Sequence, residues 1–200
     1  MFLGIDCSGV MAEMVLVAAD GREFFVREDT PRQADVIFPM LEKILAEAKI
    51  TMREISAIGA ITGPGSFTGI RVGLAFAQGI ADGLGIPAHG LSAFDALRRE
   101  TGDGREGIIV LESKRAELYM QHDGGTAMMI AEQILQLAGK DKKIIHNLGE
   151  NSPFPPLPSP FLSAAAARHA KNLFNQNTPG EILAPYYLRE ADAKPQINAA

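Results

Sequence analysis

The sequence predicts an α/β fold in which three strands are followed by alternating helices and strands. Three observations lead to this prediction. An apolar run at the N-terminus ends in the polar turn Asp6–Gly9, and apolar doublets recur every four residues between Val36 and Ala48. A glycine-rich loop, Gly63–Gly69, separates a further apolar run from a helical stretch of small residues. Alternation of this kind is typical of a sheet covered by helices.

The elements predicted for the first half follow one another through short connections. Strands are expected at residues 2–5, 14–18, 23–26, 55–61 and 86–91, and helices at residues 36–48, 69–84 and 92–100. Asp20-Gly21 is a hairpin signal between the second and third strands. Pro39 marks the start of the first helix or a kink in it, and Ser92 with Asp95 forms a start similar to a capping box. The predicted order is β-β-β-α-β-α-β-α.

The second half repeats strands and then helices in a shorter form. The best linker candidate is Thr101–Gly104, and a proline-rich stretch at residues 151–160 predicts an irregular connection. Strands are expected at residues 107–111, 117–121 and 144–148, and helices at residues 131–138 and 162–175, the last one capped by Ser163 or its neighbour. We predict two related lobes, residues 1–103 and an abbreviated one at residues 104–200.

Composition narrows the class of protein. The net charge is −5 and the pI is about 5.4, so a basic footprint for binding RNA alone is missing. One cysteine, Cys7, excludes an internal disulfide and fits a reducing compartment. Residues 1–5 carry no basic stretch ahead of Asp6, and no apolar run reaches the length of a membrane span. We expect a cytoplasmic protein without membrane contact.

The glycine loop Gly63–Gly69 allows two interpretations. It lacks the Gly-Lys pair of a Walker loop and the glycine spacing of a dinucleotide fingerprint. Backbone amides at a helix N-terminus could still hold an anion weakly. The favoured interpretation is structural: Ser66 or Thr68 caps the helix and Phe67 anchors the loop in the core.

Candidates for catalysis are weak. Ser66 does not lie in a Gly-x-Ser-x-Gly elbow, and Cys7 is more typical of a small buried thiol than of a nucleophile. The four histidines are scattered along the chain, so no metal site is predicted.

Small residues recur at every fourth position of the helix that follows the loop, at Gly69, Gly73, Ala77 and Ala81. Glycine inside a helix costs up to about 1 kcal/mol relative to alanine, so close packing must offset it. The packing surface is either the chain's own sheet or a partner, and the apolar helix at residues 36–48 is the expected neighbour. The interface hypothesis comprises the following residues: Met40, Leu41, Ile44, Gly69, Gly73, Phe76, Ala77 and Ile80.

At these residues the chain resembles the TsaB (YeaZ) family, whose members are subunits of the bacterial machinery that makes threonylcarbamoyladenosine in tRNA. The matching segments are Phe2–Asp6, Phe38–Leu41, Gly63–Gly73, Ala77–Gly79 and Pro185–Arg189. The resemblance covers most of residues 1–97 and the remainder only thinly. Two departures are Gln33–Asp35, where family members often carry a histidine, and Glu112–Lys114 in the second lobe.

The resemblance implies an actin-like (ribonuclease H-like) two-lobe fold and a non-catalytic role without a cofactor. It implies that helices of the first lobe bind a TsaD-like catalytic subunit and that a TsaE-like ATPase joins this assembly. The chain would then contact tRNA only through the complex. A homodimer through the same helices is the other assembly. Actin-like phosphotransferases place a carboxylate at the end of the first strand, so Asp6, Ser66 and Thr68 are candidates for a vestigial phosphate-facing site.

Two classes of function therefore follow. The leading one is a non-catalytic scaffold subunit of the complex that modifies N6 of the adenosine at tRNA position 37, where it binds and stabilises the TsaD-like catalytic subunit. The alternative is an enzyme that acts alone, either a small actin-like nucleotide-binding phosphotransferase or a hydrolase similar to a peptidase. A single carboxylate such as Asp6 cannot run phosphoryl transfer, which requires several positioning and charge-neutralising groups.

Overall fold

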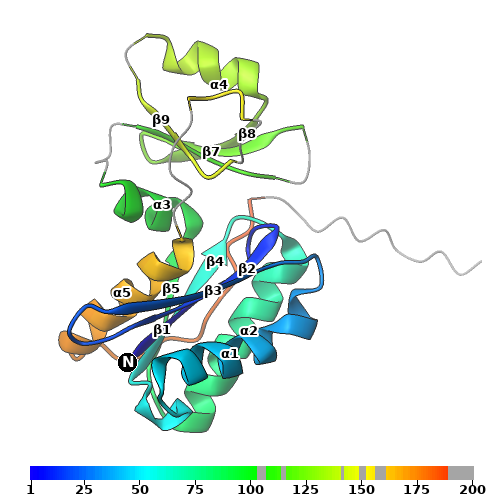
Figure 1. Cartoon of the computed structure of the whole chain (residues 1–200). Coiled ribbons are helices and arrows are strands. Elements are labelled where there is room, and N and C mark those ends of the chain that lie inside the picture. Colours follow the sequence, from blue (N-terminus) through cyan, green and yellow to red (C-terminus); the bar gives the residue numbers. More distant parts are fainter. Residues whose placement is uncertain (103–106, 114–115, 141, 149–151, 156–160, 189–200) are drawn as a thin grey trace, which may run out of the picture.

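The chain forms two β-sheets, each with its own helices, which lie one above the other in the computed structural model (Figure 1). The structure describes residues 1–102, 107–113, 116–140, 142–148, 152–155 and 161–188. No helix in these described ranges is long and apolar enough to cross a membrane. The linker expected at Thr101–Gly104 and the proline-rich stretch at residues 151–160 fall partly outside the described residues.

The first sheet has the strand order β3-β2-β1-β4-β5, and its strands and helices follow one another in the predicted order β-β-β-α-β-α-β-α. Its strands are β1 (Phe2–Asp6), β2 (Met11–Val17), β3 (Glu23–Asp29), β4 (Ala57–Gly63) and β5 (Ala88–Ser92). The first three strands are antiparallel neighbours, whereas β1, β4 and β5 run parallel. The connection between β2 and β3 is the predicted hairpin, where Gly21 has a φ of 90° that suits glycine.

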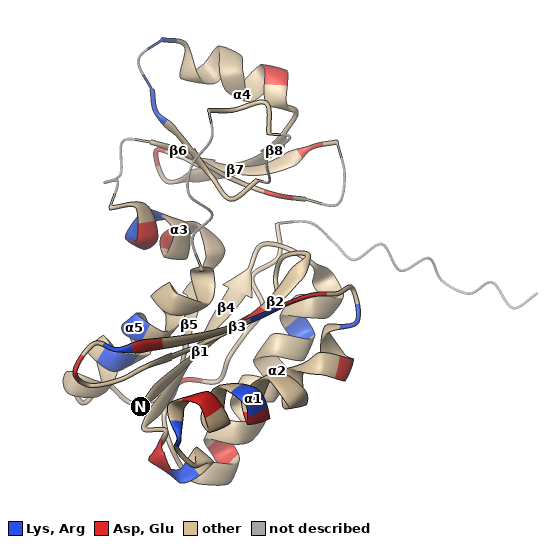
Figure 2. Ribbon diagram, in the orientation of Figure 1, with Lys and Arg blue, Asp and Glu red and all other residues tan. Residues whose placement is uncertain are grey.

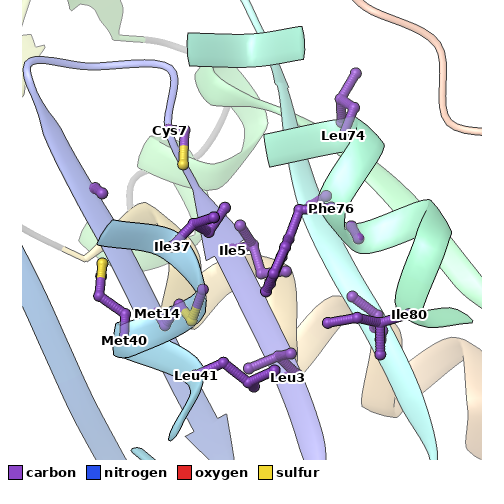
Figure 3. Close-up of a cluster of buried hydrophobic side chains, with 14 of the residues drawn as sticks. Leu3, Ile5, Cys7, Met14, Ile37, Met40, Leu41, Leu74, Phe76 and Ile80 are labelled. Carbon is purple, nitrogen blue, oxygen red and sulfur yellow. The ribbon is translucent and has the colours of Figure 1, made fainter. Parts of the chain in front are cut away.

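Two helices cover one face of the first sheet. They are α1 (Gln33–Ala48) and α2 (Phe67–Leu84), and the third helix of this half, α3 (Ala93–Thr101), begins at the predicted cap Ser92. The apolar doublets of α1 lie against Leu3, Ile5 and Met14 of the sheet (Figure 3). The Phe38 ring of α1 meets the Phe76 ring of α2 edge-on at 4.9 Å, so the two helices are neighbours, as predicted.

The opposite face is covered by α5 (Leu162–Asn175), an alanine-rich helix from the far end of the chain. Glycines on the strands let its backbone come close: a Cβ atom at Gly4 would lie 1.8 Å from the Ser163 carbonyl oxygen, and one at Gly59 would lie 2.0 Å from that of Ala166. The predicted cap at Ser163 is wrong, because α5 begins after Phe161 without a side-chain cap. The division of the lobes at residue 103 stays a prediction, and α5 packs on the first sheet although it comes late in the sequence.

The second sheet has the order β8-β7-β6-β9. Its strands are β6 (Ile108–Leu111), β7 (Leu118–His122), β8 (Gly125–Met129) and β9 (Ile144–His146), and the helix α4 (Ala131–Ala138) packs on it. Strand β8 and the short 3₁₀ helix η1 (Met52–Glu54) are the elements that the sequence analysis missed. The missed strand forms a hairpin with β7 through Asp123 and Gly124, both of which have positive φ.

Residues 178–188 form an extended C-terminal strap along the first sheet (coral in Figure 1). The amide of Glu181 donates to the Ala88 carbonyl at 3.0 Å, and the amide of Tyr186 donates to the Thr62 carbonyl at 2.8 Å. The strap therefore pairs with part of the open edge of β5 and ends beside the glycine loop. Covering an edge strand in this way removes a template for unwanted strand pairing.

Candidate functional site: the glycine loop and the helix pair

The glycine loop joins β4 to α2 where the two sheets approach each other. Its cap is Ser66, whose Oγ accepts a hydrogen bond from the Gly69 amide at 3.3 Å, so Thr68 is not the cap. Gly63 has a φ of 114°, and a Cβ atom there would lie 2.5 Å from the Tyr186 carbonyl oxygen. Only glycine fits this position, since both the backbone conformation and the space exclude a side chain.

The loop packs tightly against the turn that follows β1. The Ser66 amide donates to the Ser8 carbonyl at 2.6 Å. A Cβ atom at Gly65 would lie 2.2 Å from that same carbonyl oxygen. An amide that could have faced an anion is therefore already paired inside the chain.

A cavity of about 200 Å³ lies between the two sheets at this loop. Its lining comprises residues 8–10, 64–68, Ala93, residues 111–113, Tyr119 and Asn147. Two of the three predicted phosphate-facing residues, Ser66 and Thr68, are on this lining, but Asp6 is not. Among the described lining residues the one charged side chain is Glu112, which would repel a phosphate rather than neutralise it.

Asp6 lies instead beside a second buried carboxylate, Glu13, its register partner on β2. Asp6 accepts a hydrogen bond from the Ser8 amide at 2.7 Å, and Glu13 accepts one from Arg27 at 2.6 Å. Burial raises the pKa of both carboxyl groups, that of Glu13 to about 7, and Asp6 contributes to the rise at Glu13. Sequence reasoning missed Glu13, although an acid within an otherwise apolar strand was the signal that could have identified it.

The remaining nucleophile candidate, Cys7, is buried under α2. Burial raises the pKa of its thiol, and the carboxylates Asp6 and Glu13 raise it further. A Cβ atom at Gly73 would lie 3.3 Å from the Cys7 Cβ. Within the described residues no group of three or more His, Cys, Asp or Glu side chains is arranged to hold a metal.

The predicted interface residues all lie in the interior of this chain. Met40, Leu41, Phe76 and Ile80 point into the core between the helices and the sheet (Figure 3). Ile44, Gly69, Gly73 and Ala77 are also buried. A Cβ atom at Gly69 would lie 2.0 Å from the Cys7 carbonyl oxygen, so the first small residues of α2 pack on the chain's own sheet.

A second set of small residues on α2 faces outward, and the sequence analysis did not single it out as a surface. This outer stripe comprises Thr68, Ala75, Gly79 and Gly83, which are all exposed. Cβ atoms at Gly79 and Gly83 would meet nothing within 4 Å. On the neighbouring helix, Phe38 is 63% exposed although its ring packs on Phe76.

Comparison with known families now identifies the chain's relatives. Residues 30–154 match the family model described as TsaD: tRNA N6-adenosine threonylcarbamoyltransferase. The chain belongs to this family. Proteins named TsaB also match over a little less than half of the chain: the protein from Escherichia coli K12 is 34% identical over 101 residues, which are 48% of this chain and 42% of that protein. These matches confirm the predicted resemblance to the TsaB (YeaZ) family.

Longer matches cover nearly the whole chain. An uncharacterized protein of Mycobacterium tuberculosis H37Rv is 32% identical over 183 residues, 85% of this chain and 81% of that protein. An uncharacterized protein of Mycobacterium leprae is 29% identical over 96% of this chain, which spans 56% of that relative's length. The structure of YeaZ from Pseudomonas aeruginosa superimposes with a TM-score of 0.67 at 22% identity, covering 92% of this chain and 98% of that one. This likeness shows that the chain shares the α/β fold of YeaZ, as the resemblance to that family implied.

Proposed function

We propose that this chain is a non-catalytic scaffold subunit of the machinery that makes threonylcarbamoyladenosine in tRNA. In this proposal it binds and stabilises a TsaD-like catalytic subunit through the outer surface of α1 and α2. The observation that carries the proposal is the outer stripe of small residues on α2 beside the exposed ring of Phe38. The TsaB relatives support it, because their names assign them to tRNA threonylcarbamoyladenosine biosynthesis.

A non-catalytic role fits the chemistry of the glycine loop. Phosphoryl and acyl transfers need donors and cations aimed at the charge that develops in the transition state. Here the Ser66 amide is paired with Ser8, and Glu112 is the charged side chain among the described residues that line the cavity. Asp6 is buried away from that cavity. We infer that Asp6, Ser66 and Thr68 are vestiges of a phosphate site, of which Ser66 now caps α2 and Asp6 holds the turn after β1.

The geometry of the helix pair suits a helical partner. Residues without bulky side chains allow the axes of two packed helices to come close. Gly79 and Gly83 leave such space on α2, and Phe38 offers a large apolar side chain next to it. The predicted interface residues support this surface from beneath, since Met40, Leu41, Ile44, Phe76 and Ile80 fix α1 and α2 on the sheet.

The remaining partners follow from the same assignment. We propose that a TsaE-like ATPase joins the assembly, that tRNA reaches this subunit only through the complex, and that the complex is cytoplasmic. A homodimer would use the same outer surface of α1 and α2 and would compete with the catalytic subunit. Size measurement of the chain with rising amounts of the catalytic subunit distinguishes these assemblies.

Two matched variants test the scaffold proposal. Gly79→Leu places a bulky side chain in the open space of the outer stripe, whereas Gln136→Leu adds the same side chain to the exposed face of α4. We expect Gly79→Leu to abolish association with the TsaD-like subunit of the same cell and to reduce threonylcarbamoyl transfer, while Gln136→Leu retains both. A folded Gly79→Leu chain that still binds and supports transfer would contradict this placement of the interface.

A second function is favoured by one observation, the cavity between the sheets at the N-terminus of α2. A small actin-like phosphotransferase would bind a nucleotide in such a cavity. Calorimetry with the purified chain and Mg-ATP tests this alternative. Micromolar binding with turnover in the absence of partners would replace the scaffold proposal, whereas no binding would support it.

A further inference from the structure

Arg71 on the first turns of α2 is held in one orientation by two aromatic rings. Its guanidinium carbon lies 3.8 Å from the centre of the Phe67 ring and 5.9 Å from that of Tyr187. The two rings stack on each other, with centroids 4.7 Å apart and planes 28° apart. The Nε of Arg71 donates a hydrogen bond to the Tyr187 hydroxyl at 3.0 Å.

This arrangement joins distant parts of the chain. Phe67 is the first residue of α2, and Tyr187 lies at the end of the C-terminal strap, 116 residues after Arg71. The strap is itself fastened next to this point, because the Tyr186 amide donates to Thr62 just before the glycine loop. The position of the guanidinium thus depends on the glycine loop and on the docked strap together.

Unlike four other arginines of the chain, Arg71 has no carboxylate partner among the described residues. Arg22, Arg27, Arg32 and Arg168 each form an ion pair with a carboxylate. Among the described residues no carboxylate forms an ion pair with Arg71, which is exposed. Since Nε is used by Tyr187, the two terminal nitrogens remain for another ligand. A guanidinium presents these nitrogens in a planar fork that matches a carboxylate.

The location of Arg71 connects it to the proposed interface. Residues three and four apart share one side of a helix, so Arg71 lies between Thr68 and Ala75 of the outer stripe. It is the one basic residue of α2, a helix with few charges (Figure 2). Arginines that are held in place, at the edge of a surface that excludes water, are frequent hot spots of protein interfaces.

We propose that Arg71 is the electrostatic anchor of the partner interface and forms an ion pair with a carboxylate of the TsaD-like subunit. The strap residue Tyr187 acts as a positioning residue that holds the guanidinium before the partner arrives. This inference rests on the proposed function and adds the chemistry of one contact to it. A protein carboxylate is preferred over an RNA phosphate because Arg71 continues a stripe suited to a helix and because the chain carries a net charge of −5.

The test compares four variants for binding to the TsaD-like subunit by calorimetry at low and at high salt. Arg71→Met removes the charge, Arg71→Lys keeps the charge without the fork, and Tyr187→Phe keeps the ring without the hydroxyl. Arg53→Met, on the exposed η1, is the matched control at the opposite end of β4. Thermal unfolding verifies that each variant is folded. If Arg71→Met does not fold, the conclusion is drawn from Arg71→Lys instead.

We expect the dissociation constant to rise about tenfold or more for Arg71→Met, and less for Arg71→Lys and Tyr187→Phe, with no change for Arg53→Met. The affinity of the unmodified chain should fall with salt more steeply than that of Arg71→Met, because ions screen the lost charge pair. Wild-type affinity in folded Arg71→Met would overturn the anchor, and so would a loss of tRNA binding by the complex at unchanged partner affinity. Failure of the unmodified chain to bind the partner would instead overturn the proposed function and this inference with it.

Discussion

Asp6 and Glu13 are directly opposite each other across the antiparallel strands β1 and β2, and both carboxyl groups are buried. Burial opposes ionisation of either group, and the charge of one opposes ionisation of the other. Arg27 and Ser163 contribute hydrogen bonds that favour the charged form of Glu13 without cancelling these effects. The pair therefore links the stability of the first sheet to pH.

The pKa of Glu13 predicts the direction of that link. Its value is about 7 in the folded chain against an ordinary value of 4.5, so the folded state binds this proton more tightly than the unfolded state. The resulting stabilisation is complete below about pH 4.5 and is lost as the pH rises through about 7. Denaturant unfolding of the chain should show a decrease on the order of 3 kcal/mol from Glu13 over this range.

The variant Glu13→Gln isolates this contribution. Glutamine keeps the shape and cannot ionise, so we expect the decrease in unfolding free energy between pH 5 and pH 8 to become smaller. Glu42→Gln on the exposed side of α1 is the control and should leave the pH profile unchanged. An unaltered profile in Glu13→Gln would show that this carboxyl group titrates normally.

The glycines of α2 divide into two kinds, which alanine substitutions should separate. Gly69→Ala places a Cβ atom 2.0 Å from the Cys7 carbonyl oxygen, a clash with backbone that no rotamer relieves. We expect a loss of about 3 kcal/mol or more in unfolding free energy. Gly79→Ala meets nothing within 4 Å and should stabilise the free chain by up to about 1 kcal/mol. Chemical denaturation measures both, and equal effects would contradict this division of the helix.

The sequence predicted the first lobe well because its signals are local. Apolar spacing at residues 36–48, the Asp20-Gly21 turn and the cap at Ser92 each depend on neighbouring residues. Strand β8 was missed, since Gly125–Met129 is exposed or half-buried and has no alternation strong enough to mark it. The cap at Ser163 was wrong because the hydroxyl of this serine is buried against Glu13, a residue 150 positions away.

The candidate site was harder to predict because its contacts join residues that are far apart in the sequence. Small residues at every fourth position, at Gly69, Gly73 and Ala77, indicate that another segment packs closely on this side of α2. They do not identify that segment. The neighbour of the first two is Cys7, which follows β1, and that contact depends on the tertiary fold. The Arg71 contact with Tyr187 spans 116 residues and has no local signal at all.

The thiol of Cys7 should be almost unreactive in the folded chain. The thiolate is the reactive form, and burial together with Asp6 and Glu13 raises the thiol pKa above its ordinary value. We expect a thiol reagent to label the native chain very slowly and the denatured chain fully. A chain with Cys7→Ala and Thr68→Cys is the control, because its thiol lies at an exposed position and should react rapidly. Rapid labelling of native Cys7 would revive the hydrolase alternative.

The contact between β4 and α5 predicts a further position where only glycine fits, because any side chain would clash with backbone atoms. A Cβ atom at Gly59 would lie 2.0 Å from the Ala166 carbonyl oxygen and 2.4 Å from its carbonyl carbon, so Gly59→Ala must displace the helix. We expect a loss of about 3 kcal/mol or more in unfolding free energy, since the alanine-rich face of α5 packs directly on the sheet. Hydrogen exchange should then accelerate at the amides of α5 before those of α1.

A matched substitution tests whether this cost comes from the close approach of the helix. Gly9→Ala introduces the same methyl group where the nearest atom would lie 4.0 Å away, and its unfolding free energy should stay within about 0.5 kcal/mol of the unmodified chain. If Gly59→Ala were as stable as Gly9→Ala, with slow exchange retained in α5, the helix would not rest on the strand at this distance. If only Gly59→Ala is destabilised, the first sheet depends on a helix contributed from the far end of the chain.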